Sequence, residues 1–190
     1  MKKMIIFSLL ALGIQHNTNA QFYKSVLPSP AFTESLGQVA RDFRNNFYQI
    51  QGAQLPSQED MDVYKSLVTI PGATHCVIYR FHSKEDTTAS WQGILYSGEN
   101  YNEAVKAYKN TCRQISKSRI KTSDNSLSGF SGKMDEPDAN VRFVSSSFKL
   151  NSKDPAYDKF YADVELVNLS FDQWEVHLNL QYKRDDDGND

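Results

Sequence analysis

The amino-acid sequence predicts an α+β fold: an antiparallel sheet of about six strands with two helices packed on one face, in the order α-βββ-α-βββ. Two stretches of the chain, 32–50 and 100–118, repeat apolar residues at helical spacing. The other apolar residues lie in short runs rich in β-branched and aromatic side chains, which are typical of strands. The connections between these runs are short, and short connections favour antiparallel neighbours.

Residues 1–20 have the layout of a cleavable signal peptide. Two lysines precede an apolar run that begins at Met4 and ends near Ile14, and the small residues up to Ala20 form the cleavage site. This short basic start is typical of bacterial signal peptides. The apolar run is shorter than the roughly 20 residues that span a bilayer, and no later run approaches that length. We therefore predict an exported protein, periplasmic or extracellular, without a membrane span.

The chain that remains after cleavage is long enough for one domain, because 170 residues follow Ala20. We expect residues 21–184 to form a single α+β domain and residues 185–190, a run of like charges, to be a disordered acidic tail. The formal net charge is −2, and lysine and arginine are scattered along the chain. The sequence therefore lacks the basic stripe of a nucleic-acid-binding protein, and we predict no nucleic-acid partner.

The first predicted helix is amphipathic. Ser29 is its expected N-cap, Pro30 lies in its first turn and Gly52 follows its end. Apolar residues spaced three and four apart place one side of this helix against the core. These residues are Phe32, Leu36, Val39, Phe43, Phe47 and Ile50.

The second predicted helix, 100–118, separates two groups of three strands, and Cys112 lies near the middle of its apolar side. The segment 116–140 is polar and is expected to be a long loop, which in a compact domain is either functional or disordered. A predicted turn at 84–87 joins two of the strands. The predicted strands cover 63–70, 74–82, 89–97, 141–150, 159–168 and 173–183.

This order of elements is similar to that of several small α+β families, including the type III secretion chaperone-like group. The similarity is one of element order, without a shared motif. What it implies is a third reading of the function, a secreted chaperone or assembly factor.

The stretch GATHCVIYRFH, residues 72–82, concentrates reactive side chains in one predicted strand. His75 and His82 are seven residues apart, so a strand directs them to opposite faces, about 23 Å from each other. Cys76 and His82 share a face but are separated by about 20 Å, too far for a nucleophile and its base. The stretch therefore contains no catalytic dyad. Because no ligand set or phosphate loop follows elsewhere, we predict no metal site and no cofactor.

Cys76 and Cys112 are the two cysteines of the chain. In an exported protein, a single pair predicts one disulfide bridge. The bridge requires Cys76 to face the helices, and alternation then turns Tyr79 and Phe81 to the other face. There, together with Trp91, they would form an exposed aromatic binding patch. The alternatives are a strand that is covered on both faces, or a bulge that changes the alternation.

The last predicted hairpin places a carboxylate beside His177. If the apolar faces match, Asp163 lies opposite His177. If the register slips by two residues, Glu165 lies there instead. Such a pair raises the pKa of an imidazole and suits acid–base chemistry, although many such pairs are solvated cross-strand contacts.

These observations favour a non-enzymatic domain that acts through a surface and binds a protein, an envelope component or a small ligand. The alternative is a hydrolase-type enzyme that uses His177 with Asp163 or Glu165. An enzyme requires a concave pocket around His177, whereas a binding module requires exposed aromatic residues or a groove on the face away from the helices. The sequence does not specify the partner or the oligomeric state.

Overall fold

The structure of the chain is a computed structural model that describes residues 27–58, 60–81, 88–170 and 173–183. The predicted signal peptide, the predicted turn at 84–87 and the predicted acidic tail lie outside the described residues. Within the described ranges, no helix is both long enough and apolar enough to cross a membrane.

The described residues form two α-helices, two short 3-10 helices and nine strands. The helices are α1 (Pro30–Asp42), η1 (Phe43–Asn45), α2 (Tyr101–Lys117) and η2 (Pro155–Tyr157). The strands of the first half of the chain are β1 (Gln51–Gln58), β2 (Met61–Ser66), β3 (His75–Phe81) and β4 (Ala89–Gly98). Those of the second half are β5 (Arg119–Lys121), β6 (Leu127–Gly132), β7 (Phe143–Asn151), β8 (Phe160–Ser170) and β9 (Gln173–Tyr182).

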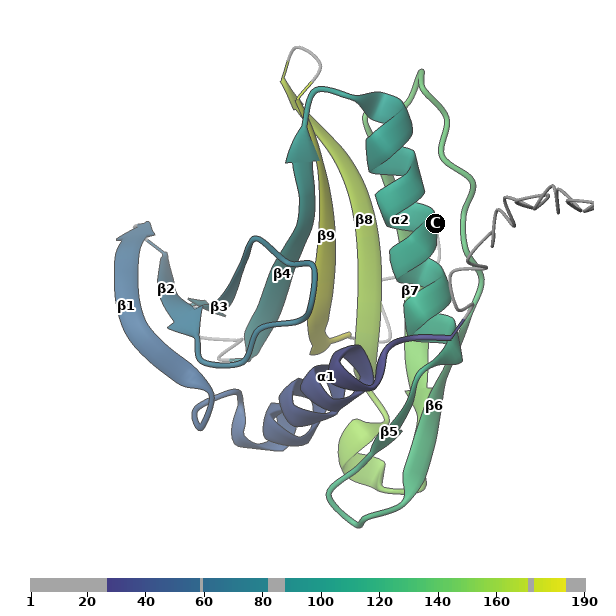
Figure 1. Cartoon of the computed structure of the whole chain (residues 1–190). Coiled ribbons are helices and arrows are strands. Elements are labelled where there is room, and N and C mark those ends of the chain that lie inside the picture. The colour runs from purple at the N-terminus through teal and green to yellow at the C-terminus, as the bar shows by residue number, and fades with distance from the viewer. Residues whose placement is uncertain (1–26, 59, 82–87, 171–172, 184–190) are drawn as a thin grey trace, which may run out of the picture.

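The nine described strands belong to one antiparallel sheet, in the order β1-β2-β3-β4-β9-β8-β7-β6-β5. Each half of the chain contributes one α-helix followed by a meander of neighbouring strands (Figure 1). The last strands of the two halves, β4 and β9, pair with each other, with Trp91 opposite Leu180. This β4–β9 seam joins the two meanders into a continuous sheet whose edges are β1 and β5.

The predicted fold class is wrong. The described chain has a mostly-β fold with one nine-stranded sheet, rather than about six strands with two packed helices in the order α-βββ-α-βββ. The sequence analysis missed β1, β5 and β6. Strand β1 (QGAQLPSQ) is polar and contains glycine and proline, β5 has three residues, and β6 (LSGFSG) lies in the predicted loop 116–140. These segments become strands because they pair with β2, with each other and with β7, which overrides their weak local preference.

Both α-helices begin where the sequence predicts. Ser29 is the N-cap of α1, and its hydroxyl accepts a hydrogen bond from the backbone N–H of Phe32 at 3.1 Å. Asn100 caps α2 in the same way, because its side chain accepts from the backbone N–H of Glu103 at 3.2 Å. The prediction of a helix over 100–118 is confirmed by α2, and Cys112 faces the core as expected.

Helix α1 ends at Asp42, earlier than predicted. The buried carboxylate of Asp42 accepts hydrogen bonds from the backbone N–H groups of Gln49 at 3.0 Å and Ile50 at 3.1 Å, which turns the chain back on itself. Asn46 and Phe47 have φ angles of 51° and 60°, which lie in the left-handed region. Phe47 and Ile50 are therefore buried from a turn rather than from a helix.

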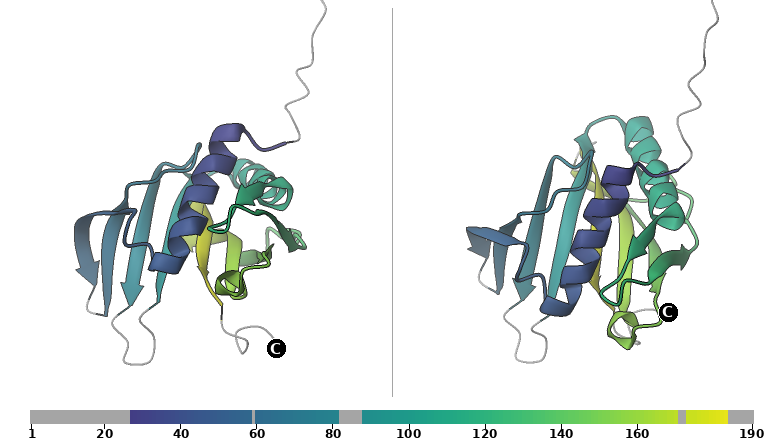
Figure 2. Two further views of the ribbon diagram at one scale, coloured as in Figure 1. Left: turned by 90° about the horizontal axis from the view of Figure 1, so that it is seen from below. Right: turned by 60° about the horizontal axis from the view of Figure 1, so that its bottom comes forward.

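The core lies between the sheet and the two helices. Helix α2 packs against β4, β6, β7, β8 and β9, and Figure 1 shows it in front of the sheet. Helix α1 crosses the same side of the sheet at an angle to α2 (Figure 2). The segment after β6 is attached to α2, because the Tyr108 hydroxyl donates to the backbone oxygen of Asp135 at 3.1 Å. Part of the predicted loop 116–140 is thus fixed to the core.

Candidate functional site

Strand β3 determines which side chains face the helices. Cys76, Ile78 and Arg80 have exposed fractions of 3%, 0% and 9%, so this row faces the core. Alternation directs Tyr79 and Phe81 to the opposite face of the sheet. We call this the helix-free face, because α1 and α2 do not cover it (Figure 1). Phe81 is 46% exposed there.

Arg80 stabilises the inward orientation of β3. Its Nε donates to Oε1 of Gln51 at 2.6 Å, and its Nη2 donates to the backbone oxygen of Asn46 at 2.7 Å. The guanidinium carbon lies 3.7 Å from the centre of the Tyr48 ring, in cation–π geometry. The end of β3 is thereby attached to the segment between α1 and β1.

Both cysteines of the described chain are buried free thiols, so the predicted disulfide between Cys76 and Cys112 is absent from this structure. Cys112 contacts Ser146. The residues that follow Cys76 across the sheet, one strand at a time, are Gly93, Leu178, Val164 and Ser146. Four strand spacings correspond to roughly 19 Å along the sheet, whereas a bridge requires Cα atoms within about 7 Å.

Burial favours the protonated form of both thiols in the folded chain. Burial raises the pKa of Cys76 above its ordinary value and raises the pKa of Cys112 to about 11. Both groups are therefore protonated at neutral pH, and the thiolate is the nucleophilic form.

A groove of about 470 Å³ opens on the helix-free face beside Tyr79 and Phe81. It is lined from five strands, β1, β2, β3, β4 and β9. None of its lining residues, all of which are described, carries a formal charge, and we therefore call it the neutral groove. They are Pro56, Met61, Val63, Tyr79, Phe81, Ser90, Gln92, Asn179 and Gln181.

Hydrogen bonds fix the polar side chains of the neutral groove. The Tyr79 hydroxyl donates to Oε1 of Gln92 at 3.1 Å, and Nε2 of Gln92 donates to Oδ1 of Asn179 at 2.9 Å. Burial raises the pKa of Tyr79, so its hydroxyl remains a donor. Among the described residues, nothing hydrogen-bonds to the hydroxyl of Ser90 or to Oε1 of Gln181, and both are available to a ligand.

Trp91 does not belong to this surface. It lies opposite Ile78 in the sheet register and shares the inward face with that residue. Its side chain is 0% exposed, and its Nε1 donates to the hydroxyl of Ser66 at 2.9 Å. The predicted patch of Tyr79, Phe81 and Trp91 is thus reduced to its first two members.

The β8–β9 register places Glu165 opposite His177, and Asp163 opposite Asn179. The register with a two-residue slip is therefore the observed one. His177 Nδ1 lies 3.9 Å from the Glu165 carboxylate, and its Nε2 lies 2.7 Å from the Glu175 carboxylate on the same strand. Burial raises the pKa of Glu165 above its ordinary value. Both ring nitrogens are thus directed at carboxylates.

Asp163 belongs to a neighbouring hydrogen-bond network on the helix-free face. It is 2% exposed and accepts hydrogen bonds from the Ser147 hydroxyl, from Gln181 at 2.8 Å and from the ammonium group of Lys183 at 3.2 Å. Lys183 also donates to Ser147 at 2.6 Å. Because a carboxylate neutralises the ammonium group, this serine and lysine do not form a nucleophile and a free base.

His177, Glu165 and Asp163 are not among the described residues that line the neutral groove, and they line neither of two further cavities beside α1. Among all the described residues, no group of three or more histidine, cysteine or acidic side chains is arranged to hold a metal ion.

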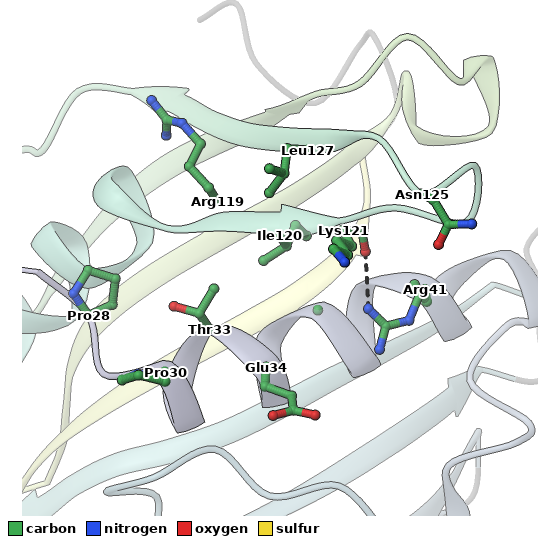
Figure 3. A pocket seen from close by; sticks show the side chains of 11 residues that line it. Pro28, Pro30, Thr33, Glu34, Arg41, Arg119, Ile120, Lys121, Asn125 and Leu127 are labelled. Carbon is green, nitrogen blue, oxygen red and sulfur yellow. Dashed lines mark hydrogen bonds between the residues drawn. The ribbon is translucent and has the colours of Figure 1, made fainter.

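A second cavity, of about 580 Å³, lies between α1 and the β5–β6 hairpin (Figure 3). Pro28 and Pro30 lie at one end of it, and Arg41 and Asn125 at the other. Arg41 donates to the backbone oxygen of Lys121 at 3.1 Å and so connects the helix to the hairpin.

Local sequence pattern located part of the neutral groove, because Tyr79 and Phe81 were predicted to be binding residues. The predicted strand 173–183 also places Asn179 and Gln181 on the face of His177, since residues two apart in a strand share a face. Pro56 was missed because β1 has no strand pattern, and the second cavity was missed because it depends on Arg41 meeting Lys121, 80 positions away. Comparison of the chain with protein-family models, with curated proteins and with solved structures found no match.

Proposed function

We propose that this protein is an exported, non-enzymatic binding module that holds a neutral saccharide in the neutral groove. One observation carries the proposal. Cys76, Ile78 and Arg80 of β3 face the core. Tyr79 and Phe81 therefore lie on the helix-free face, beside a groove whose lining residues are uncharged. A cavity of this size falls within the range of small-ligand sites.

The chemistry of the lining selects the class of ligand. Tyr79 and Phe81 offer aromatic faces to the apolar side of a sugar ring. Gln92, Asn179 and Gln181 supply amide donors and acceptors, and Ser90 adds a hydroxyl, which suit the alternating hydroxyl groups of a saccharide. A charged ligand would lose its hydration without gaining an opposite charge from these side chains.

The groove is organised before the ligand arrives. The bonds from Tyr79 to Gln92 and from Gln92 to Asn179 hold three lining side chains in place. Side chains that are already ordered lose less conformational entropy on binding. This supports a recognition role for the polar row.

Neither the hydrolase reading nor the chaperone reading has a comparable observation in its favour within the described part of the chain. His177 has carboxylates at both ring nitrogens and is not among the described residues that line the neutral groove or the two cavities beside α1. The chaperone reading rested on an element order that the nine-stranded sheet replaces.

The proposal is tested by titrating the ¹⁵N-labelled protein with cellohexaose, maltohexaose and chitohexaose. We expect at least one of them to shift the backbone amide signals of Tyr79, Gln92 and Asn179 in a saturable way. Phe81→Ala should weaken that binding about two- to tenfold, because it removes one aromatic contact.

Phe143→Ala is the matched control. Phe143 lies on β7, is also exposed (52%), and is not part of the neutral groove. It should leave the affinity unchanged. The proposal is wrong if none of the three saccharides shifts these signals, or if the two alanine variants weaken binding equally.

A further inference from the structure

The cavity between α1 and the β5–β6 hairpin is separate from the neutral groove and shares none of its lining residues. Its width is set by a close approach at Gly37, where an added Cβ would lie 3.6 Å from the Cβ of Ile120 and 3.1 Å from the Arg41 guanidinium. The cavity runs along α1 from Pro30 to Arg41, a distance of roughly 16 Å at the rise per residue of an α-helix.

One part of this cavity is apolar. Ile120 lies in its wall and is 1% exposed, whereas Leu127 on the neighbouring strand is 68% exposed. Pro28 and Pro30 add apolar surface at the start of α1 (Figure 3). Leu127 lies opposite Lys121 in the hairpin register, and its exposed side chain loses unfavourable contact with water when an apolar ligand covers it.

The charged side chains of the cavity are mostly cationic. Arg41, Arg119 and Lys121 line it, against a single lining carboxylate, Glu34. Within the described chain, none of the three cations forms an ion pair, although other surface cations do, such as Lys109 with Glu136. The cavity therefore carries positive charge that the described side chains do not neutralise.

Arg41 and Lys121 are the cations placed to bind a ligand. The guanidinium of Arg119 lies against Gly129, the residue opposite it on β6, and donates to the backbone oxygen of Ser118 at 3.1 Å, so it is directed across the hairpin. Arg41 uses one N–H for the Lys121 backbone oxygen, and its other N–H groups can bind a planar anion. Figure 3 shows both residues away from the proline end.

We propose that this cavity binds a small amphipathic carboxylate, with the carboxylate at Arg41 and Lys121 and the apolar body along Leu127 and the two prolines. Charge complementarity selects an anion, and the apolar wall selects one with a hydrocarbon body. An added peptide strand does not fit, because α1 already lies along the edge strand β5 and Arg41 occupies a backbone oxygen of that strand.

The probe is decanoate, used below the concentration at which it forms micelles, and binding to the full chain is measured by isothermal titration calorimetry. We expect saturable binding of decanoate that weakens as salt is added, because the contact is partly exposed to solvent. Decylammonium has the same hydrocarbon body and the opposite charge, and it should not bind. Equal binding of the two amphiphiles, or no binding of decanoate, overturns the proposal.

Two substitutions that should change decanoate affinity in opposite directions locate the site. Lys121→Gln removes a cation and should weaken decanoate binding about two- to fivefold. Glu34→Gln removes the only carboxylate among the lining residues and should strengthen it by a similar factor. Because one of the changes improves binding, a partly unfolded variant cannot imitate the pair of results.

Lys149→Gln is the matched control, since Lys149 is an exposed lysine on β7 that lines neither cavity. It should leave decanoate affinity unchanged, as should Phe81→Ala in the neutral groove. If Lys149→Gln weakens binding as much as Lys121→Gln, the contact is general charge attraction and the assigned site is wrong. A loss of decanoate binding in Phe81→Ala would instead place decanoate in the neutral groove and would also overturn the proposal.

Discussion

The two faces of the sheet both bury polar side chains, but they do so by different means. On the inward face, Arg80 is buried and is held by the backbone oxygen of Asn46, by the side chain of Gln51 and by the ring of Tyr48. On the helix-free face, Asp163 is buried by other polar side chains, such as Gln181 and Lys183. The inward face therefore combines an apolar core with a few anchored polar groups, whereas the helix-free face is a hydrogen-bonded layer that a ligand or a change of pH can reach.

The largest expected difference between the faces is in the accessibility of thiols. Cys76 and Cys112 should react with a thiol reagent about a thousandfold or more slowly in the native protein than in the unfolded chain, because they are exposed only when the core opens. The added thiol of Ser90→Cys, on the helix-free face, should react rapidly. Denatured wild-type protein without reductant should contain two free thiols, and fewer would show that the bridge forms.

The next largest effect is expected from truncating the aromatic side chains of the two faces. Trp91→Ala should lower the free energy of unfolding by about 3 to 5 kcal/mol, because it empties a fully buried site and removes the hydrogen bond that the indole donates to the Ser66 hydroxyl. Phe81→Ala should lower it by less than about 1 kcal/mol. Urea denaturation of both variants measures the difference, and similar losses would contradict the assignment of the faces.

Arg80→Met tests the polar anchor of the inward face. We expect the free energy of unfolding to fall by about 2 to 4 kcal/mol, because the side chain of Gln51 and the backbone oxygen of Asn46 lose their donors. Arg44→Met is the control, since Arg44 forms a surface ion pair with Asp154 at 3.2 Å. It should cost less than about 1 kcal/mol. Equal losses in the free energy of unfolding would show that Arg80 stabilises the fold no more than a residue in a surface ion pair does.

The smallest effect is expected from Glu165 on the helix-free face. Because burial raises its pKa in the folded state, folding favours the protonated form. Its contribution to stability is fully present below the ordinary pKa of about 4.3 and is lost as the pH rises through the raised value. Glu165→Gln should therefore gain stability relative to wild type as the pH rises above about 4.3. A difference that does not change with pH would contradict this sign.

The sequence pattern predicted an element correctly where the signal lies within the residues of that element. The N-cap of α1 at Ser29, the helix over 100–118 and the strand over 173–183 depend on local signals, and the structure has them where they were predicted. It failed where pairing determined the structure, as in β1, β5 and β6. It also left open which row of β3 faces the core, because Cys76–Ile78–Arg80 and Val77–Tyr79–Phe81 are both compatible with alternation.

The candidate sites were less predictable than the fold. Tyr79 and Phe81 followed from the alternation of β3, once the inward row was known. The register of β8 and β9 was one of two alternatives, and the slip that brings Glu165 to His177 depends on pairing along the whole hairpin. The cavity beside Arg41 had no local signal, because a helix and a short hairpin form it from distant parts of the chain.

The β4–β9 seam constrains the order in which the chain folds. Gln92 and Asn179 meet across it although they are 87 positions apart, whereas every other pair of neighbouring strands in the described sheet is consecutive in the chain. Closing so long a loop loses more chain entropy than forming a hairpin. We therefore expect the two meanders to form first and to join late. The neutral groove, whose polar row crosses the seam, is then among the last surfaces that the folding chain completes.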